Sequence, residues 1–386
     1  MKQIKTILLA ATAALLFAGV AGCKKDTLKS NDKTFNIEKF KQNLKVQLGT
    51  SIVGYSVVIS KDGQFADSIQ YGNATASSFS SASTPMTMNT YINIASVTKT
   101  LTAIAAIKML NEKGILIDSK IEEYLPAYWN ATTAVENITF KELLTHTSGL
   151  RETTTSYDSL KAQCARGLDG SKSRSYANCN FALFRAILPY IDNLTAMKSN
   201  ENAAVGSNNT TAFETLLSQR YLTLMQQNVF TPAGLSNVTC NDASIAGLQT
   251  NMFSEGLAMN IISTSGNWTE TCAGGGYYLT TLQMANVMAY LGHSTTLLSA
   301  AQKTVMNAEL YGWDPEDSPT TSAGKAYGKD GALIWTGIAP NSPGLQTYVC
   351  NYPKGIDVAI SINSLSGSNF RNMSTLALTA YEASWD

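Results

Sequence analysis

The sequence predicts an α+β fold, in which both ends of the chain build one antiparallel sheet around an inserted, mainly helical region. Strand patterns lie near the start of the chain and return near its end, at 52–60, 68–71, 332–336, 345–352 and 358–363. The middle of the chain carries mostly helical patterns joined by polar loops. Strands at both ends with helices between them indicate a sheet assembled from the two termini, flanked by helices.

Helical patterns flank the predicted strands. Phe40, Leu44 and Leu48 share one face of an amphipathic helix over 35–48. The turn signal Lys61-Asp62-Gly63 separates the two strands that follow. A final helix is expected over 370–384.

The inserted region is expected over about 118–323, between an α/β part at 34–117 and its continuation at 324–386. A strong helix pattern over 96–113 precedes it. The segment 195–210 is polar and shows no periodicity, so we expect a surface loop there. Further helices are predicted within the region at 140–144, 180–191, 213–227 and 281–291.

Composition excludes a nucleic-acid-binding protein. The 386 residues carry no net charge, and charged residues make up 15% of the chain, against about 25% in an average soluble protein. The sequence contains no basic tract or basic-aromatic stripe. Such a neutral, polar composition is common in exported proteins.

The N-terminus predicts export. Lys2 and Lys5 precede an apolar run from Ile7 to Val20, which is short for a membrane span. The tetrad Val20-Ala21-Gly22-Cys23 resembles a bacterial lipobox. This resemblance implies a signal peptide over 1–22, lipidation of Cys23 and a tether over 23–33. A plain signal peptide with a chance cysteine is the alternative. We expect a lipid-anchored cell-envelope protein, at the outer membrane and facing the periplasm or the surface.

An oxidising compartment makes disulfides plausible. With the lipobox cysteine set aside, an odd number of the six cysteines remains, so at least one thiol is left over. Two pairs each bracket an irregular stretch, which favours Cys164–Cys179 and Cys240–Cys272. Cys350 is then expected free and buried in a strand.

Ser96 and Lys99 form the first candidate catalytic pair. Residues three apart on a helix share a face, so Lys99 should lie beside the Ser96 hydroxyl at the start of the helix. A helix N-terminus also favours the negative charge of a forming alkoxide. Lysine can act as a base if burial or a nearby cation lowers its pKa. A helix N-cap with a solvated lysine is the structural alternative.

Three motifs in order carry a family resemblance. Ser96-Val97-Thr98-Lys99 is followed by Tyr176-Ala177-Asn178 and Lys329-Asp330-Gly331. The chain thereby resembles the serine β-lactamase and penicillin-binding-protein superfamily, of the class C β-lactamase and D-peptidase or esterase type. Further matching segments lie at 139–150, 230–235 and 274–276. The resemblance spans 52–363 and implies a three-layer α/β/α fold.

The resemblance also implies roles for these residues. Ser96 would attack a carbonyl and form an acyl-enzyme, Lys99 would take or relay its proton, and Tyr176 would pass that proton on and later activate water. The substrate-binding residues would be Asn178, Lys329 and Gly331. The backbone amides of Ser96 and Ala332 would form the oxyanion hole. No metal or cofactor is implied.

Asp330 departs from the family pattern. The family usually has Thr or Ser here, and that hydroxyl commonly binds the carboxylate of a β-lactam or peptide terminus. A carboxylate would repel such an anion unless Lys329 neutralises it or the side chain turns away. The departure therefore favours an ester, amide or neutral-ended substrate.

The histidines argue against other hydrolytic mechanisms. The chain has two, His146 and His293, and it has neither a Gly-x-Ser-x-Gly elbow nor a His-Glu-x-x-His motif. His146 is expected to be structural, at a helix end, and His293 to be solvated. The sequence thus predicts an exported serine hydrolase acting on an amide, peptide or ester. A penicillin-binding D,D-peptidase or β-lactamase is one alternative, and a non-catalytic envelope-binding lipoprotein is another.

Overall fold

The computed structural model describes residues 33–76, 82–255, 261–264, 266–337, 341–366 and 369–386. The predicted signal peptide, Cys23 and nearly all of the tether lie outside these residues, so export and lipid anchoring stay predictions. Residues 35–386 form one compact unit. Within the described part of the chain, every helix is too short or too polar to cross a membrane.

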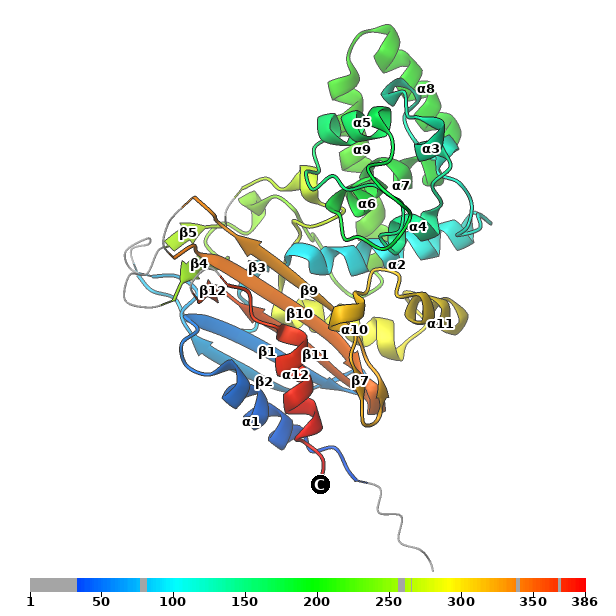
Figure 1. Cartoon of the computed structure of the whole chain (residues 1–386). Coiled ribbons are helices and arrows are strands. Elements are labelled where there is room, and N and C mark those ends of the chain that lie inside the picture. Colours follow the sequence, from blue (N-terminus) through cyan, green and yellow to red (C-terminus); the bar gives the residue numbers. More distant parts are fainter. Residues whose placement is uncertain (1–32, 77–81, 256–260, 265, 338–340, 367–368) are drawn as a thin grey trace, which may run out of the picture. The chain divides into compact units, whose positions relative to one another are not determined.

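An eight-stranded sheet draws most of its strands from the two ends of the chain, as the sequence predicts (Figure 1). Its path runs β12-β4-β10-β11-β1-β2, with β5 paired to β4 and β9 paired to β10. All these pairs are antiparallel except β4 with β12. The strands are β1 (Gly54–Lys61), β2 (Gln64–Gly72), β4 (Asn251–Ser254), β5 (Ile261–Ser263), β9 (Tyr327–Ile334), β10 (Gly344–Tyr352), β11 (Ile356–Ile362) and β12 (Ser364–Leu365).

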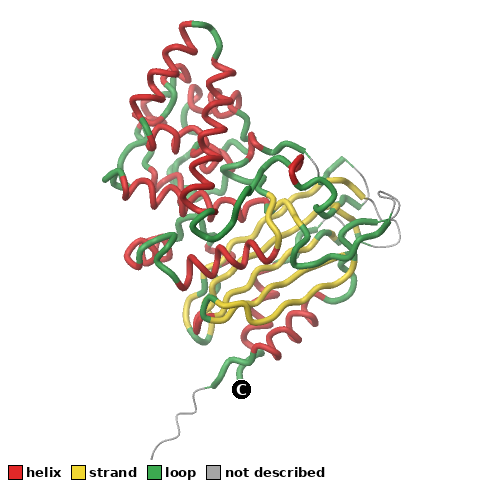
Figure 2. The backbone as a smooth tube through the Cα atoms, turned by 180° about the vertical axis from the view of Figure 1, so that it is seen from behind, coloured by secondary structure: helices red, strands yellow, loops and turns green. Residues whose placement is uncertain are grey.

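Helices cover both faces of the sheet, which gives the expected three layers (Figures 1 and 2). Side chains alternate between the faces of a strand. Val57 and Ile59 therefore pack with α1 (Ile37–Leu48) and α12 (Met373–Glu382), while Val58 belongs to the core on the other side. Helix α10 (Thr281–His293) packs across β1, β10 and β11.

The remaining helices form the inserted region, which begins after α2 (Thr98–Glu112). They are α3 (Thr133–Glu136), α4 (Phe140–Leu144), α5 (Tyr157–Arg166), α6 (Asn178–Ala182), α7 (Phe184–Asp192), α8 (Leu194–Gly206), α9 (Thr210–Met225) and α11 (Ala300–Glu309).

The loop predicted over 195–210 is wrong, because this segment forms α8 and the start of α9. Asn193 caps α8 by accepting a hydrogen bond from the Ala196 amide. The helix buries Glu201, which accepts a 2.5 Å hydrogen bond from the Tyr190 hydroxyl. A search for apolar periodicity misses such a helix, since part of its buried face is polar.

Two boundaries also differ from the expectation. Strands β4 and β5 lie within 118–323 yet join the main sheet, because Phe253 pairs with Gly344. Strand β9 begins at Tyr327, so Lys329-Asp330-Gly331 lies inside the strand and not before it. The third motif is therefore held by the hydrogen bonds of the sheet.

The structure forms one of the two expected disulfides. Cys240 is bonded to Cys272, and Cys350 is free and buried in β10, as predicted. The Cys164–Cys179 pairing is wrong, since both thiols are free and buried. Cys164 lies in α5, where its carbonyl accepts a hydrogen bond from the Thr132 amide, and Cys179 lies in α6, where its amide donates to the Glu152 carbonyl. Burial raises the pKa of both thiols to about 12.

His293 is exposed, as expected, but it also makes a hydrogen bond to the sheet. It ends α10, and its Nε2 lies 2.8 Å from Oδ2 of Asp357, a buried residue of β11. This hydrogen bond raises the pKa of His293. The pair joins α10 to the sheet.

Candidate active site

Ser96 lies where a short strand turns into a helix. Strand β3 (Tyr91–Asn93) leads into a single 3₁₀ turn, Ala95–Val97, and then into α2. Ala95 has a φ of 47°, which is strained for a residue with a Cβ. The Asn93 side chain supports the turn, because its Oδ1 accepts a 2.9 Å hydrogen bond from the Ala95 amide. The strain and its support place Ser96 at the head of the helix.

Lys99 lies beside the Ser96 hydroxyl, as the helical spacing predicts. Its side chain is 1% exposed, and Nζ donates a 3.0 Å hydrogen bond to Ser96 Oγ. Nζ also donates to Asn178 Oδ1 over 3.0 Å and to the Gly274 carbonyl over 2.5 Å. Burial and the nearby Lys329 ammonium lower the pKa of Lys99. This lysine is therefore easier to deprotonate than a free one.

Tyr176 reaches the same oxygen from the inserted region. Its hydroxyl donates to Ser96 Oγ over 2.8 Å. The ammonium groups of Lys99 and Lys329 lie 5.0 and 5.2 Å from the centroid of its ring. Burial opposes ionisation of the phenol, but the two lysines outweigh it and lower the pKa of Tyr176. The residue is still 41% exposed, so a substrate can reach it.

His146 packs against this tyrosine, at the end of α4 where the sequence places it. The two ring centroids are 4.5 Å apart. His146 Nδ1 accepts a 3.3 Å hydrogen bond from the Ala177 amide, which puts the proton of the neutral ring on Nε2. Burial, helped by Lys99, lowers the pKa of His146 to about 3. A neutral, weakly basic ring fits a supporting role.

Lys329 projects from β9 and is 1% exposed. Its Nζ donates to Asp314 Oδ2 over 2.6 Å and to the Asp330 carbonyl over 2.8 Å. The Asp330 carboxylate lies 3.5 Å away. Burial works against the charge, but Tyr176, Asp314 and Asp330 together raise the pKa of Lys329. This lysine stays a cation.

Gly331 lets β9 pass close to the nucleophile. A Cβ on this residue would lie 2.4 Å from the Ile94 carbonyl oxygen and 2.9 Å from the Ser96 amide nitrogen. Ala332, the next residue, lines the same pockets as Ser96. The two amides expected to form the oxyanion hole thus belong to segments that are in contact.

The Asn178 side chain is already engaged. Its Oδ1 accepts from Lys99, and its Nδ2 donates to the Thr153 carbonyl over 3.1 Å. The structure thus brings Asn178 to the site with the other predicted residues. One amide hydrogen is left for a substrate, because an amide nitrogen has two.

Sequence reasoning missed three charged residues of the site. Asp314 is 7% exposed and binds Arg174 as well as Lys329. Asp317 Oδ2 accepts a 2.9 Å hydrogen bond from the Asp330 amide, and burial and Asp330 raise the pKa of Asp317 to about 7. The one signal in the sequence that could have found these residues is their position: Arg174 lies close to the tyrosine motif, and the two aspartates precede the lysine motif.

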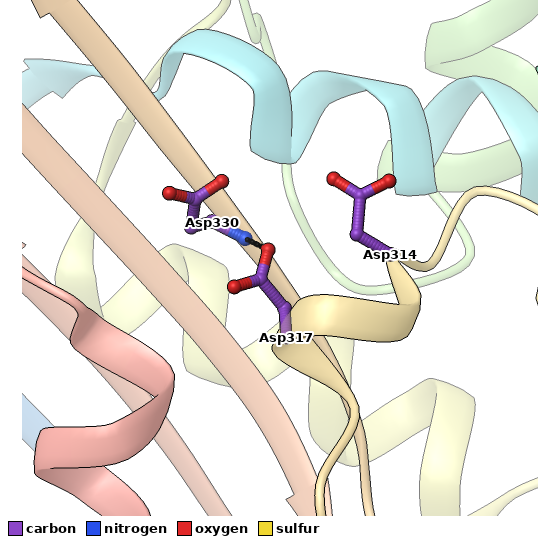
Figure 3. A group of neighbouring side chains, drawn as sticks. All are labelled: Asp314, Asp317 and Asp330. Carbon is purple, nitrogen blue, oxygen red and sulfur yellow. Dashed lines mark hydrogen bonds between the residues drawn. The ribbon is translucent and has the colours of Figure 1, made fainter. Parts of the chain in front are cut away.

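Asp314, Asp317 and Asp330 form a carboxylate cluster (Figure 3). Their ligand-type oxygens lie within 4.8 Å of one another, a spacing that suits a cation. The Lys329 ammonium already lies 2.6 Å from Asp314 and 3.5 Å from Asp330. We therefore assign the cluster to Lys329 as its countercharge.

Two pockets flank Ser96, and both include Asn178 and Ala332. The larger, of about 470 Å³, has a charged lining: Arg174, Asp314, Glu316, Asp317 and Asp330. The smaller, of about 170 Å³, is uncharged and includes Thr153, Thr155, Trp268, Thr271 and Gly274–Gly276. A substrate can therefore extend to both sides of the nucleophile.

Comparisons with known proteins agree with this fold. The chain is similar to EstCE1, described as a hydrolase with promiscuous acyltransferase activity (TM-score 0.63, 14% identity, 90% of this chain and 99% of that chain). It is also similar to a D-amino acid amidase from Ochrobactrum anthropi SV3 (TM-score 0.60, 14% identity, 90% of this chain and 96% of that chain). A third similar structure is a class C beta lactamase from Rhodobacter sphaeroides, with a TM-score of 0.59 and 15% identity over 90% of this chain and 98% of that chain. No curated protein sequence matches significantly.

The family follows from the sequence match. A family model described as Beta-lactamase matches residues 38–379. This range includes both groups of strands, the inserted helices and all three motifs around Ser96. Since it leaves out little more than the termini, the chain belongs to the beta-lactamase family of serine hydrolases.

Proposed function

We propose that this protein is an acyl-transfer hydrolase that uses Ser96 to cleave amides or esters. One observation carries the proposal: Ser96 Oγ accepts hydrogen bonds from both Tyr176, over 2.8 Å, and Lys99, over 3.0 Å. A nucleophile within hydrogen-bond reach of its base is the arrangement that activates serine.

The reaction has two steps. Ser96 Oγ attacks the substrate carbonyl while its proton moves to the Tyr176–Lys99 pair, and the same proton then leaves with the amine or alcohol. The acyl-enzyme ester is cleaved when the pair takes a proton from water and returns it to Ser96. The amides of Ser96 and Ala332 would stabilise the oxyanion, each by about 3 kcal/mol.

The charged pocket supports a substrate without a carboxylate on that side. Four carboxylates and one guanidinium line it, and Lys329 is already bound to Asp314. An anionic group would meet repulsion there, whereas a neutral or cationic group would not. The fold likeness to a D-amino acid amidase and to EstCE1 is compatible with amide or ester cleavage.

Paired substrates test the proposal. We expect hydrolysis of neutral or amine-bearing esters and amides, slow acylation by a labelled penicillin, and no reaction in Ser96→Ala. Asp330→Thr should raise penicillin acylation about tenfold, since it removes a repulsion worth about 1.4 kcal/mol. Faster turnover of penicillin than of every neutral substrate would contradict the substrate assignment, as would no response to Asp330→Thr.

We also propose that Cys23 anchors the protein to the outer membrane. The lipobox-like tetrad and the preceding apolar run support the lipid anchor. Metabolic labelling with an alkynyl fatty acid should mark the protein, and Cys23→Ser should abolish the label. Labelling that survives this substitution would overturn the assignment.

A further inference from the structure

Asp314 is a buried carboxylate that none of the three motifs contains. Its Oδ2 lies 2.6 Å from Lys329 Nζ, and its Oδ1 accepts a 2.9 Å hydrogen bond from Arg174. The residue is 7% exposed. A buried charge needs partners on every side, and removal of one partner from such a group is costly. Asp314 and its two cations thus form one unit.

This unit joins two segments that must meet for catalysis. Lys329 belongs to β9, whereas Arg174 lies two residues before Tyr176 in the loop that precedes α6. Asp314 lies on a third segment, which is fixed to β9 because its amide donates to the Gly328 carbonyl over 3.3 Å. Figure 3 shows its carboxylate on the segment that leads into the turn bearing Asp317.

Asp314 also sets the charge around the phenol. Lys99 and Lys329 lie about equally far from the Tyr176 ring. The Asp314 carboxylate helps Lys329 to stay charged, and it raises the pKa of Tyr176 against the effect of both lysines. Other groups that face Asp314 or the phenol are His146, Arg174, Asp317 and Asp330.

We propose that Asp314 is a positioning residue, whose carboxylate fixes Lys329 beside Tyr176 and, through Arg174, ties the tyrosine's loop to β9. The inference rests on the proposed function of Ser96. Asp314 touches no reacting atom, so its effect is transmitted through Lys329 and Tyr176. Loss of its charge leaves the phenol in a more positive surrounding, which favours phenolate at lower pH.

The test measures how fast a fluorophosphonate labels Ser96 at each pH, in the full-length protein and its variants. For Asp314→Asn we expect labelling about 10- to 100-fold slower at the plateau, because Arg174 then no longer ties the tyrosine's loop to β9. The acid limb of the profile should move to lower pH by on the order of one unit. Asp192→Asn is the matched control: Asp192 also accepts a hydrogen bond from an arginine, Arg220 over 3.1 Å, but it lines neither pocket beside Ser96. It should keep the wild-type limb and a rate within about threefold.

Asp314→Glu separates charge from geometry. It keeps the carboxylate, so its acid limb should stay at the wild-type pH even if its rate is reduced. If Asp314→Asn does not fold, Asp314→Glu alone tests the inference. A shift of the acid limb of its pH profile away from the wild-type pH would overturn the inference. An unchanged limb in folded Asp314→Asn, or an equal shift in Asp192→Asn, would overturn it as well. If the wild type is not labelled at Ser96, the proposed function fails and this inference falls with it.

Discussion

At the scale of single residues, the two site lysines differ because their neighbours differ. Lys99 is buried among uncharged oxygens, from Ser96, Asn178 and Gly274, so its pKa is lowered. Lys329 is equally buried, but Tyr176 and the carboxylate of Asp314 outweigh the effect of burial and raise its pKa. The first is suited to proton transfer and the second to a fixed charge.

Replacement of the first lysine tests this division. Lys99→Met keeps the length of the side chain and removes the amine, so we expect the rate of Ser96 acylation to fall about 1,000-fold. Lys108→Met on the same helix is the matched control, because Lys108 donates only a long 3.5 Å hydrogen bond to a backbone carbonyl. The rate of Ser96 acylation is measured in both variants by stopped-flow or discontinuous labelling. An equal loss of this rate in the two variants would contradict the assignment.

The pH dependence follows from the direction of the shifts. Lysines lower the pKa of Tyr176, while burial and Lys329 lower that of Lys99, so the base form should appear below the ordinary values near 10. The kcat/KM should rise with pH and reach its plateau below pH 10, with an apparent pKa that belongs to the pair. A kcat/KM that still rises tenfold per pH unit above pH 10 would contradict this assignment of the base.

At the scale of elements, the sequence predicted the three motifs of the site but neither Asp314 nor the start of β9. The three motifs were found because each is a short run with its own residue pattern. Asp314 was missed because a buried carboxylate leaves no pattern in the sequence, and it is recognised by its contacts with Arg174 and Lys329. The strand start at Tyr327 was missed because glycine and aspartate are uncommon in strands.

Gly331 tests the close approach of β9 to the nucleophile. In Gly331→Ala, the added Cβ would overlap backbone atoms of Ile94 and Ser96, which cannot move aside as a flexible side chain can. We expect at least a 100-fold loss of acylation rate with the fold retained by circular dichroism. Gly206→Ala is the control, since a Cβ there meets nothing within 4 Å. Full activity in Gly331→Ala would show that the strand does not touch the reacting centre.

At the scale of the whole molecule, the sequence predicts the sheet correctly, whereas its errors lie in the inserted region. Nearly continuous apolar runs in β1 and β11 mark strands that are buried on both faces, so the sequence indicates that both chain ends share a sheet. The sequence does not predict the helix at 195–210, because α8 buries only two side chains and one of them, Glu201, is polar. The Cys164–Cys179 pairing failed for a related reason: spacing along the chain does not say which helix holds each thiol.

The Cys240–Cys272 disulfide should stabilise the whole unit. It closes a sequence separation of 32 residues, for which chain entropy gives about 3–4 kcal/mol. Urea unfolding of Cys240→Ser should therefore show a loss of this order, and added reductant should not lower its stability further. Wild-type stability that equals that of the variant under oxidising conditions would rule out the bridge.

The central claim is that Ser96 is the acylated nucleophile. Incubation with a fluorophosphonate, digestion and mass spectrometry test it most directly. We predict one adduct, on the peptide that contains Ser96, which is lost in Ser96→Ala and strongly slowed in Tyr176→Phe. An adduct on another residue, or none on Ser96 while the protein is folded, would contradict the account.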